Sequence, residues 1–303
     1  MKDAFLTYDG RRTFEIMHEK LDKVWNEVSR VLIPGGLACI NIGDATRKFG
    51  GSFRLYSNHT KIVSKFESLN FQMLPSIIWR KSTTKPNKFM GSGMEPPNAY
   101  VTLEHEYVLI FRKGGLRKFI DKEKENRRKS VYFWEERNRW FSDVWIDLRG
   151  ASQDFDVDKR DNKEMRSRSA AFPFEFAYRL INMFSLIGDT VLDPFCGTGT
   201  TMQAAAVSGR NSIGYEIEVN FKDLMIKKIE KSKEISKDVV NRRIKEHLLF
   251  MEKRKRDRKV GKKYFSKRYG FEVVTAQEID IEFPIVDRIE RIGDCEFEIE
   301  YTF

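Results

Sequence analysis

The stretch VLDPFCGTGTTMQAAAV (191–207) decides the fold of this 303-residue chain. It is typical of a strand that ends at Asp193, followed by a turn with Gly197 and Gly199 and then an Ala-rich helix. Glycines let the backbone approach a ligand closely, and a helix N-terminus offers free N–H groups and a partial positive charge. No Gly-Lys-Ser/Thr follows, as a P-loop requires, and no third glycine completes G-x-G-x-x-G. The stretch therefore predicts a ligand-binding turn that matches neither nucleotide motif.

The next strand, NSIGYEI (211–217), carries a carboxylate near its end at Glu216. A carboxylate on a neighbouring strand end can accept both hydroxyls of a ribose, as in dinucleotide-binding folds. Asp193 then lies near the amino end of the ligand, where it can meet an ammonium group. An amino acid joined to a nucleoside fits this pair of acids, so we predict S-adenosylmethionine as the cofactor. The alternative is an ordinary strand–turn–helix with a solvated Glu216, which the coincidence of turn motif and spaced acid disfavours.

Outward from this stretch, segments with helical periodicity alternate with segments typical of strands. The predicted helices are 14–32, 58–68, 172–185 and 200–207, and the predicted strands are 37–42, 72–80, 104–113, 190–194 and 211–217. Residues 82–102 are predicted as a long loop, 220–268 as a basic helix-prone stretch, and 271–303 as a β-rich tail. Alternating strands and helices imply an α/β fold with a largely parallel sheet.

The composition limits the class of protein. Hydrophobic residues make up 41% of the chain, and the formal net charge of +10 favours a polyanionic partner. Cys39, Cys196 and Cys295 are odd in number and widely spaced, which fits neither a disulfide framework nor a zinc site. We therefore expect no metal site and a reducing cytoplasm. The chain has no apolar signal region and no apolar run near the ~20 residues that span a bilayer, so we expect no membrane contact.

The turn also carries a family resemblance. Asp193-Pro194-Phe195-Cys196-Gly197-Thr198-Gly199-Thr200-Thr201 resembles the cofactor motif of amino-methyltransferases that act on DNA. Phe172-Pro173 resembles the motif that these enzymes close over the methionine end, although plain helix initiation with Pro in the first turn explains it equally well. The resemblance implies a cofactor site made of Phe172, Pro173, Asp193, Pro194, Phe195, Gly197, Thr198, Gly199, Thr200 and Glu216.

The order of the parts resembles the permuted group that contains many cytosine-N(4) enzymes of restriction–modification systems. Segments 30–36, 41–44, 77–81 and 106–111 resemble that group's elements, and the likeness covers roughly residues 14–220. It implies a class I S-adenosylmethionine-dependent methyltransferase fold, Rossmann-like with an inserted target-recognition region. The predicted division is 1–113 as the catalytic half, 114–170 as the target-recognition region, 171–220 as the cofactor half, and 221–303 as a basic helical extension with a β-rich tail.

The catalytic motif of that group is absent from the sequence. Its members place Ser/Asp-Pro-Pro-Tyr/Phe before the first helix, where oxygen acceptors hold the target amine and the ring stacks on the flipped base. The only Pro-Pro pair here is Pro96-Pro97, preceded by Glu95 and followed by Asn98 in the predicted loop, so we interpret it as a loop turn. We expect the motif upstream of Met1 and assign no catalytic residue. Asp44 follows a strand end and either lines the pocket or caps a helix.

The implied reaction is attack of an exocyclic amine of DNA on the sulfonium methyl, which needs no covalent nucleophile. Ring-carbon methylation uses a cysteine in a Pro-Cys context, and none of the three cysteines follows a proline. The target base must leave the duplex to reach the cofactor. Residues expected to grip DNA phosphates are Arg80, Lys81, Lys85, Lys88, Arg137 and Arg139, against the alternative that each is a solvated surface charge. The basic runs at 226–232 and 252–263 are interpreted as solvated helix faces.

We therefore expect a cytosine-N(4) methyltransferase acting on double-stranded DNA, with a cognate restriction endonuclease system as its context. Three alternatives stay open. An adenine-N(6) enzyme shares the cofactor site and the chemistry, and the decisive acceptor lies in the missing motif. An inactive cofactor-binding fragment or subunit would need a separate catalytic segment. An RNA or protein methyltransferase is compatible with the basic charge.

Overall fold

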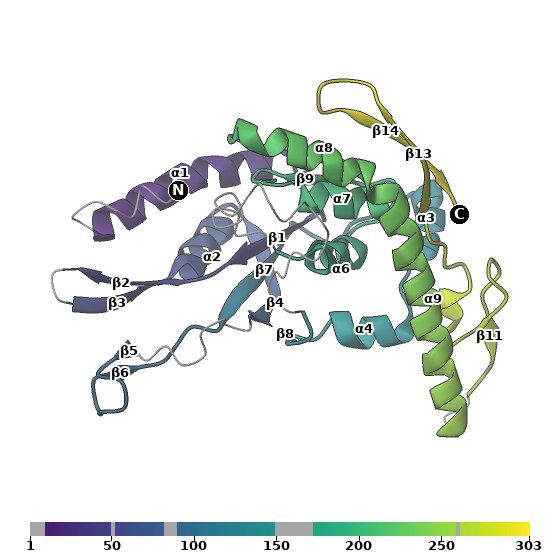
Figure 1. Cartoon of the computed structure of the whole chain (residues 1–303), viewed down its shortest axis with the longest axis horizontal. Coiled ribbons are helices and arrows are strands. Elements are labelled where there is room, and N and C mark those ends of the chain that lie inside the picture. Colours follow the sequence, from purple (N-terminus) through teal and green to yellow (C-terminus); the bar gives the residue numbers. More distant parts are fainter. Residues whose placement is uncertain (1–9, 50–51, 82–89, 149–171, 259–260) are drawn as a thin grey trace. The chain divides into compact units, whose positions relative to one another are not determined.

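The computed structural model describes residues 10–49, 52–81, 90–148, 172–258 and 261–303 (Figure 1). By its internal contacts the chain forms two compact units. Unit 1 comprises Met1–Lys118 with Ser142–Gly150, and unit 2 comprises Phe119–Phe141 with Ala151–Phe303.

Unit 1 is built on a four-stranded sheet with the order β1-β7-β4-β8. Its elements are α1 (Gly10–Val31), β1 (Leu37–Ile42), β2 (Ala45–Phe49), β3 (Ser52–Tyr56), α2 (Asn58–Ser68), β4 (Phe71–Arg80), β5 (Met90–Gly91), β6 (Ala99–Tyr100), β7 (His105–Lys113) and β8 (Val144–Trp145). β7 lies between β1 and β4 and is antiparallel to both, whereas β4 and β8 are parallel. Three strands therefore share one direction, as a largely parallel sheet predicts, but two of the three ladders are antiparallel because β7 is in the middle.

The core of unit 1 forms where α1 and α2 cover this sheet. Trp25 of α1 packs with Phe66 of α2, and the Phe66 ring stacks on Phe111 of β7 with centroids 4.4 Å apart. The helical spacing of apolar residues in 14–32 predicted this face, and α1 ends before Pro34-Gly35, where Gly35 has φ +77°. The Gly35 amide donates to the Lys113 carbonyl at 2.7 Å, and this hydrogen bond ties the end of α1 to β7.

Three details of unit 1 differ from the sequence prediction. β2 and β3 form an antiparallel hairpin where no element was predicted, and Phe49 pairs with Ser52 across it. The predicted loop 82–102 contains the short pair β5–β6. β1, predicted as a buried strand, is half-buried at all six residues. Among the described residues it pairs only with β7, so its other edge lacks a neighbouring strand.

Unit 2 contains the parallel strand pair β10–β9 and the helices around it. Its elements are α3 (Asp121–Lys129), α4 (Trp134–Trp140), α6 (Phe174–Phe184), β9 (Thr190–Asp193), α7 (Thr200–Val207), β10 (Asn211–Gly214), α8 (Lys222–Glu230), α9 (Ser232–Arg256), β11 (Tyr264–Phe265), β12 (Glu272–Val273), β13 (Ile285–Arg291) and β14 (Phe297–Thr302). α6, α7 and the start of α9 share a core with Trp140 of α4. The Ala-rich sequence of α7 allows this close packing, because Ala204 and Ala205 are fully buried.

The basic stretch 220–268, predicted as helix-prone, is two helices followed by a strand. α8 ends at Glu230, α9 runs on from Ser232 to Arg256, and β11 follows at Tyr264. The predicted β-rich tail is present as the antiparallel pairs β11–β12 and β13–β14. Within the described ranges, no helix is long and apolar enough to cross a membrane.

The region 114–170, set apart in the sequence as target-recognition region, is divided between the units. Its helices α3 and α4 belong to unit 2, and β8 belongs to the sheet of unit 1. Trp79 of β4 donates to the Leu148 carbonyl at 2.9 Å, so the segment after β8 is tied to that sheet. Residues 149–171 lie outside the described residues.

Candidate cofactor site

The turn between β9 and α7 adopts a conformation that requires glycine at one position. Gly199 has φ +79°, and an added Cβ would lie 2.9 Å from Met225 of α8. Gly197 has φ +53°, but an added Cβ would meet only the Phe195 carbonyl at 3.9 Å, so its surroundings are open. The turn is thus packed against α8 on one side and open at Gly197, where a ligand can approach the backbone.

Glu216 is brought to this turn by the parallel pairing of β10 with β9. Gly214 pairs with Asp193, so the chain places Glu216 two residues beyond the paired strand end. Its carboxylate accepts from the Gly197 amide at 2.8 Å and from the Glu218 amide at 2.8 Å. Each oxygen keeps a further lone pair, so the carboxylate is oriented and can still accept hydroxyl groups.

Asp193 is oriented by its own turn. One carboxylate oxygen accepts from the Phe195 amide at 3.0 Å, and the other accepts from the Thr201 hydroxyl at 2.5 Å. These two bonds fix the side chain at the carboxyl end of β9, where ligands of parallel α/β sheets collect. Asp193 therefore lies on the turn itself, and Glu216, predicted with it from the sequence, reaches the same turn from beyond the end of β10 through its hydrogen bond with Gly197.

Exposed apolar side chains accompany Glu216 in a pattern that the sequence analysis did not single out. Ile217 is 97% exposed and Tyr215 is 64% exposed, on either side of the acid, and Phe195 of the turn is 43% exposed. Large apolar side chains exposed together commonly mark a binding site. The sequence did carry a signal for this pattern: the apolar Ile217 directly follows Glu216, beyond the paired end of β10.

Lys228 of α8 is a second residue that the sequence analysis did not assign to the site. Its ammonium donates to the hydroxyls of Thr198 and Thr200, at 2.7 and 2.8 Å, and both threonines are buried. In the described part of the chain Lys228 has no ion pair, and burial lowers its pKa to about 8. Its own carbonyl accepts from Gln203 of α7 at 2.6 Å, so Lys228 links α8 to the turn and to the helix that follows it.

Phe172 and Pro173 precede α6. The Phe172 ring lies 5.0 Å from that of Phe176, and Phe172 packs against the core that contains Val191 of β9 and Ala204 of α7. Pro173 is the N-cap residue of α6, and its carbonyl accepts from the Phe176 amide at 3.0 Å. Both residues therefore lie at the start of a helix that packs on α7.

The thiol of Cys196 lies in the same turn, and its pKa argues against a nucleophile. Burial, together with the charges of Asp193 and Glu216, raises the pKa of Cys196 to about 11. A thiol with a raised pKa remains protonated at neutral pH and is a poor nucleophile. This supports the prediction that the cysteine in the turn is structural.

In unit 1, polar side chains gather around the carboxyl end of β1. The carboxylate of Asp44 lies 2.8 Å from His59 Nδ1 and accepts from the His59 amide at 3.2 Å, so it caps the start of α2. The His59 ring lies 4.2 Å from that of Tyr107, whose pKa is raised by burial and by the charge of Asp44. Beside them, Asn41 donates to Glu106 at 2.7 Å, while the buried side-chain oxygen of Asn41 has no partner in the described residues.

The structure gives different surroundings to the four predicted DNA-contacting residues that it describes. In unit 1, Arg80 pairs with Glu104 at 3.2 Å, and Lys81 pairs with Glu106. In unit 2, Arg139 pairs with Glu246 at 3.4 Å, and Arg137 is exposed and stacks on the Phe141 ring at 4.2 Å. Lys85 and Lys88 lie outside the described residues.

Comparison with known proteins gives a consistent picture. The family model described as DNA methylase matches residues 1–228. The Type II methyltransferase M.MthZI of Methanothermobacter thermautotrophicus is 55% identical over 294 residues, 97% of this chain and 80% of the relative. The Type II methyltransferase M.MjaI of Methanocaldococcus jannaschii is 54% identical over 226 residues, 74% of this chain and 72% of the relative.

A solved structure is also similar. TTHA0409 of Thermus thermophilus, assigned as a DNA modification methylase and complexed with S-adenosyl-L-methionine, superposes with a TM-score of 0.60 at 35% identity. The match covers 75% of this chain and 82% of that one. The chain thus shares the α/β fold of class I S-adenosylmethionine-dependent methyltransferases.

Proposed function

The chain belongs to the DNA methylase family, and we propose that it transfers a methyl group from S-adenosylmethionine to the exocyclic amine of cytosine in the DNA of a restriction–modification system. Its similarity to relatives named Type II methyltransferases supports the restriction–modification context. The observation that carries the proposal is the turn at 193–201, where Gly197 is open and Glu216 is fixed beside it.

The residues of this turn fit the cofactor. The Glu216 carboxylate accepts the ribose hydroxyls, and the exposed Tyr215 and Ile217 provide apolar contact for the adenine ring. Asp193, held by Phe195 and Thr201, accepts from the ammonium of the methionine part. When bound, S-adenosylmethionine supplies a methyl group made electrophilic by the sulfonium. These residues hold the cofactor in place, which aligns its methyl for attack.

The acceptors for the target amine come from outside the 303 residues in this proposal. The amine lone pair is delocalised into the base, so an oxygen acceptor must take a hydrogen bond from the amine and thereby localise the lone pair. The sequence contains no Ser/Asp-Pro-Pro-Tyr/Phe tetrapeptide, and Pro96-Pro97 lies between the short strands β5 and β6. A separate segment, joined in cis or bound in trans, then supplies the acceptors and the stacking ring.

Cytosine is preferred to adenine because residues 14–145 resemble the permuted cytosine-N(4) group. The adenine-N(6) alternative shares the cofactor site, and the acceptor that distinguishes the two lies in the missing motif. On the DNA side, we propose that 114–170 contributes to target recognition and that Arg80, Lys81, Lys85, Lys88, Arg137 and Arg139 contact phosphates. The exposed guanidinium of Arg137 is best placed among those described, because it has no ion pair within that part of the chain.

The test is tritiated-methyl transfer to unmodified genomic DNA, followed by nucleoside analysis. We expect the 303-residue chain alone to transfer at least about 100-fold more slowly than the chain supplied with a Ser-Pro-Pro-Tyr segment, because misaligned reactants lose about that factor. The restored enzyme should produce N4-methylcytosine. N6-methyladenine as the product would overturn the base assignment and keep the fold. Full activity of the chain alone would show that another segment holds the amine.

A further inference from the structure

The end of α9 and the strands after it have no part in the site described above. The match to the family model ends at residue 228, before α9 begins at Ser232. Along the first part of α9 the two arginines have acidic partners: Arg242 pairs with Glu175 at 2.8 Å, and the buried Arg243 pairs with Glu136 at 2.6 Å. The exposed Lys237 and Lys245 are spaced along the same part and form no ion pair within the described residues.

The last turns of α9 carry cations that are more closely spaced along the chain. Five exposed cations lie between the last turns of α9 and the start of β11. None of them forms an ion pair within the described residues. They are Lys253, Arg256, Arg258, Lys262 and Lys263. We call them the basic surface. Only two acidic side chains, Glu252 and Asp257, lie in the same described stretch, so its charge is clearly positive.

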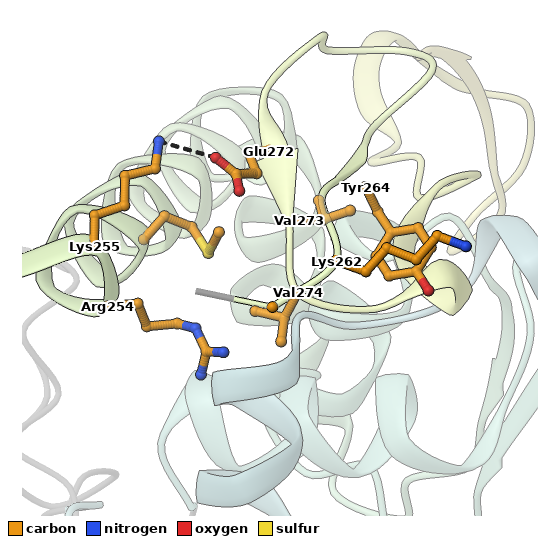
Figure 2. Close-up of a pocket in the computed structure, with 9 residues that line it drawn as sticks. Arg254, Lys255, Lys262, Tyr264, Glu272, Val273 and Val274 are labelled. Carbon is orange, nitrogen blue, oxygen red and sulfur yellow. Dashed lines mark ion pairs between the residues drawn. The ribbon is translucent and has the colours of Figure 1, made fainter. Parts of the chain in front are cut away.

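The two parts of the basic surface are held together by contacts between α9 and β12. His247 of α9 lies 3.0 Å from the Glu272 carbonyl, and Lys255 pairs with the Glu272 carboxylate at 2.9 Å. Met251 and Val273 are buried beneath. Arg254 and Lys255 of α9 and Lys262 and Tyr264 of the segment after it line one cavity of about 100 Å³. Figure 2 shows these side chains around it, with Lys255 directed toward Glu272. The end of α9 and the segment that carries Lys262 therefore lie next to each other on an ordered scaffold.

Ordinary helix chemistry explains only part of this charge. Basic residues in the last turn of a helix are favoured by its dipole, which accounts for Lys253 and Arg256. The dipole effect falls off within one turn, so it does not account for Lys262 and Lys263, which lie beyond the helix. A merely solvated surface would mix both signs of charge. Clustered unpaired cations repel one another unless a polyanion neutralises them.

We propose that the basic surface binds phosphates of the DNA backbone and adds a sequence-independent contact to the methyltransferase. The proposal rests on the proposed function, because the polyanion is the enzyme's DNA substrate. Phosphate contacts supply affinity and position without reading bases. The surface would therefore raise affinity for any duplex and leave the choice of methylated base unchanged.

The test compares R256Q/K262Q/K263Q with wild type in the full chain, by fluorescence anisotropy on a labelled duplex between 50 and 300 mM NaCl at saturating S-adenosylmethionine. Each lost phosphate contact removes about 0.9 from the slope of log K against log salt, so we expect the slope to fall by about 2 to 3 and Kd to rise at least about tenfold near 100 mM. The matched control is K23Q/K237Q/K245Q, which removes the same charge from exposed positions on α1 and α9.

Each possible result either supports or overturns the proposed role of the basic surface. A reduced slope in the first variant only, with cofactor affinity unchanged, supports the proposal. An unchanged slope, or an equal loss in the control, overturns it and leaves the proposed function standing, since DNA binding would then be shown for the wild type. No DNA binding by the wild type at 50 mM salt overturns both proposals. Tight binding of the wild type to anionic lipid vesicles with an unchanged DNA slope in the variant would assign the surface to membranes instead.

Discussion

At the scale of single residues, the carboxylate of Glu216 has two roles in this turn. It accepts a hydrogen bond from the Gly197 amide, and in the proposed complex it also accepts hydrogen bonds from the ribose hydroxyls. We expect Glu216→Ala to weaken S-adenosylmethionine binding by about 1–3 kcal/mol, the usual cost of losing a charged hydrogen-bond partner. Calorimetry measures this directly.

Glu218→Ala is the matched control for that experiment. It removes the same charge two residues away, where the side chain accepts only from Asn220 in the described residues. Its cofactor affinity should stay near that of the wild type, because the Glu218 carboxylate caps the 3-10 turn at Asn220 and makes no hydrogen bond to the turn at 193–201 in the described residues. Equal losses in both variants would remove Glu216 from the site.

Lys228 leads to a second residue-scale prediction. Lys228→Met keeps much of the side-chain volume but removes the donor shared by Thr198 and Thr200. Each of the two lost hydrogen bonds is worth about 0.5–1.5 kcal/mol, so the turn loosens and Kd for S-adenosylmethionine should rise by up to about 5- to 160-fold. Calorimetry on Lys227→Met, an exposed neighbour with the same charge, should show no change. Affinity at the wild-type level in Lys228→Met would mean that α8 does not support the turn through this contact.

The sequence predicted the acids and glycines of the site but not its supports, for a physical reason. Asp193, Gly197 and Glu216 stand at fixed spacings from strand ends, which local patterns reveal. The contact of Lys228 depends on how α8 folds back on the turn, and no spacing encodes that. Asp44 shows the same limit: its sequence position fitted both a pocket and a cap, and only the structure places it on His59.

At the scale of elements, α9 is anchored by a buried histidine. His247 has no solvent exposure, stacks on Phe133 at 3.9 Å, and lies 2.8 Å from Glu135. Burial opposes protonation of the ring, but the hydrogen bond and charge of Glu135 and the carbonyl of Glu272 outweigh it and raise the pKa of His247. The ring therefore links α4, α9 and β12.

A group whose pKa is higher in the folded protein than in the unfolded chain stabilises the fold. The full contribution is present at pH values below the unfolded pKa, which is about 6.5 for histidine. It is lost as the pH rises through the folded pKa. We therefore expect the free energy of unfolding to fall as pH rises from about 6, at no more than about 1.4 kcal/mol per pH unit for this one proton. Chemical denaturation of wild type and His247→Gln across pH 5–9 measures the difference. A difference that does not change with pH would show that His247 is neutral in the fold.

The elements whose bounds the sequence predicted correctly are short ones next to turns. α2, β1 and α7 have the predicted bounds, and glycines mark the start of two of them: Gly36 precedes β1, and Gly199 precedes α7. The β2–β3 hairpin was missed although Gly50-Gly51, a pair typical of hairpin turns, stands between its strands. Its strands, ATRKF and SFRLY, carry few apolar residues, so the periodicity that reveals a buried strand was weak.

At the scale of the whole molecule, the sequence predicted the fold class but not the grouping into two units. Segments 119–141 and 142–150 are adjacent in the chain yet belong to different units. The reason lies in their partners. The Phe133 ring stacks on His247 of α9, whereas β8 pairs with Ile78 and Trp79 of β4. Such long-range partners have no local signature in composition or periodicity.

The central position of β7 has a consequence for synthesis on the ribosome. Leu37 of β1 pairs with Arg112 of β7, about 75 residues later in the chain. Translation adds about 5–20 residues per second, so the nascent β1 waits roughly 4–15 s for its partner strand to be made. During that interval the hydrogen-bonding edge of β1 is open to the wrong partner. The order of the strands thus leaves the half-made chain with an unpaired strand edge, the kind of surface through which chains pair wrongly.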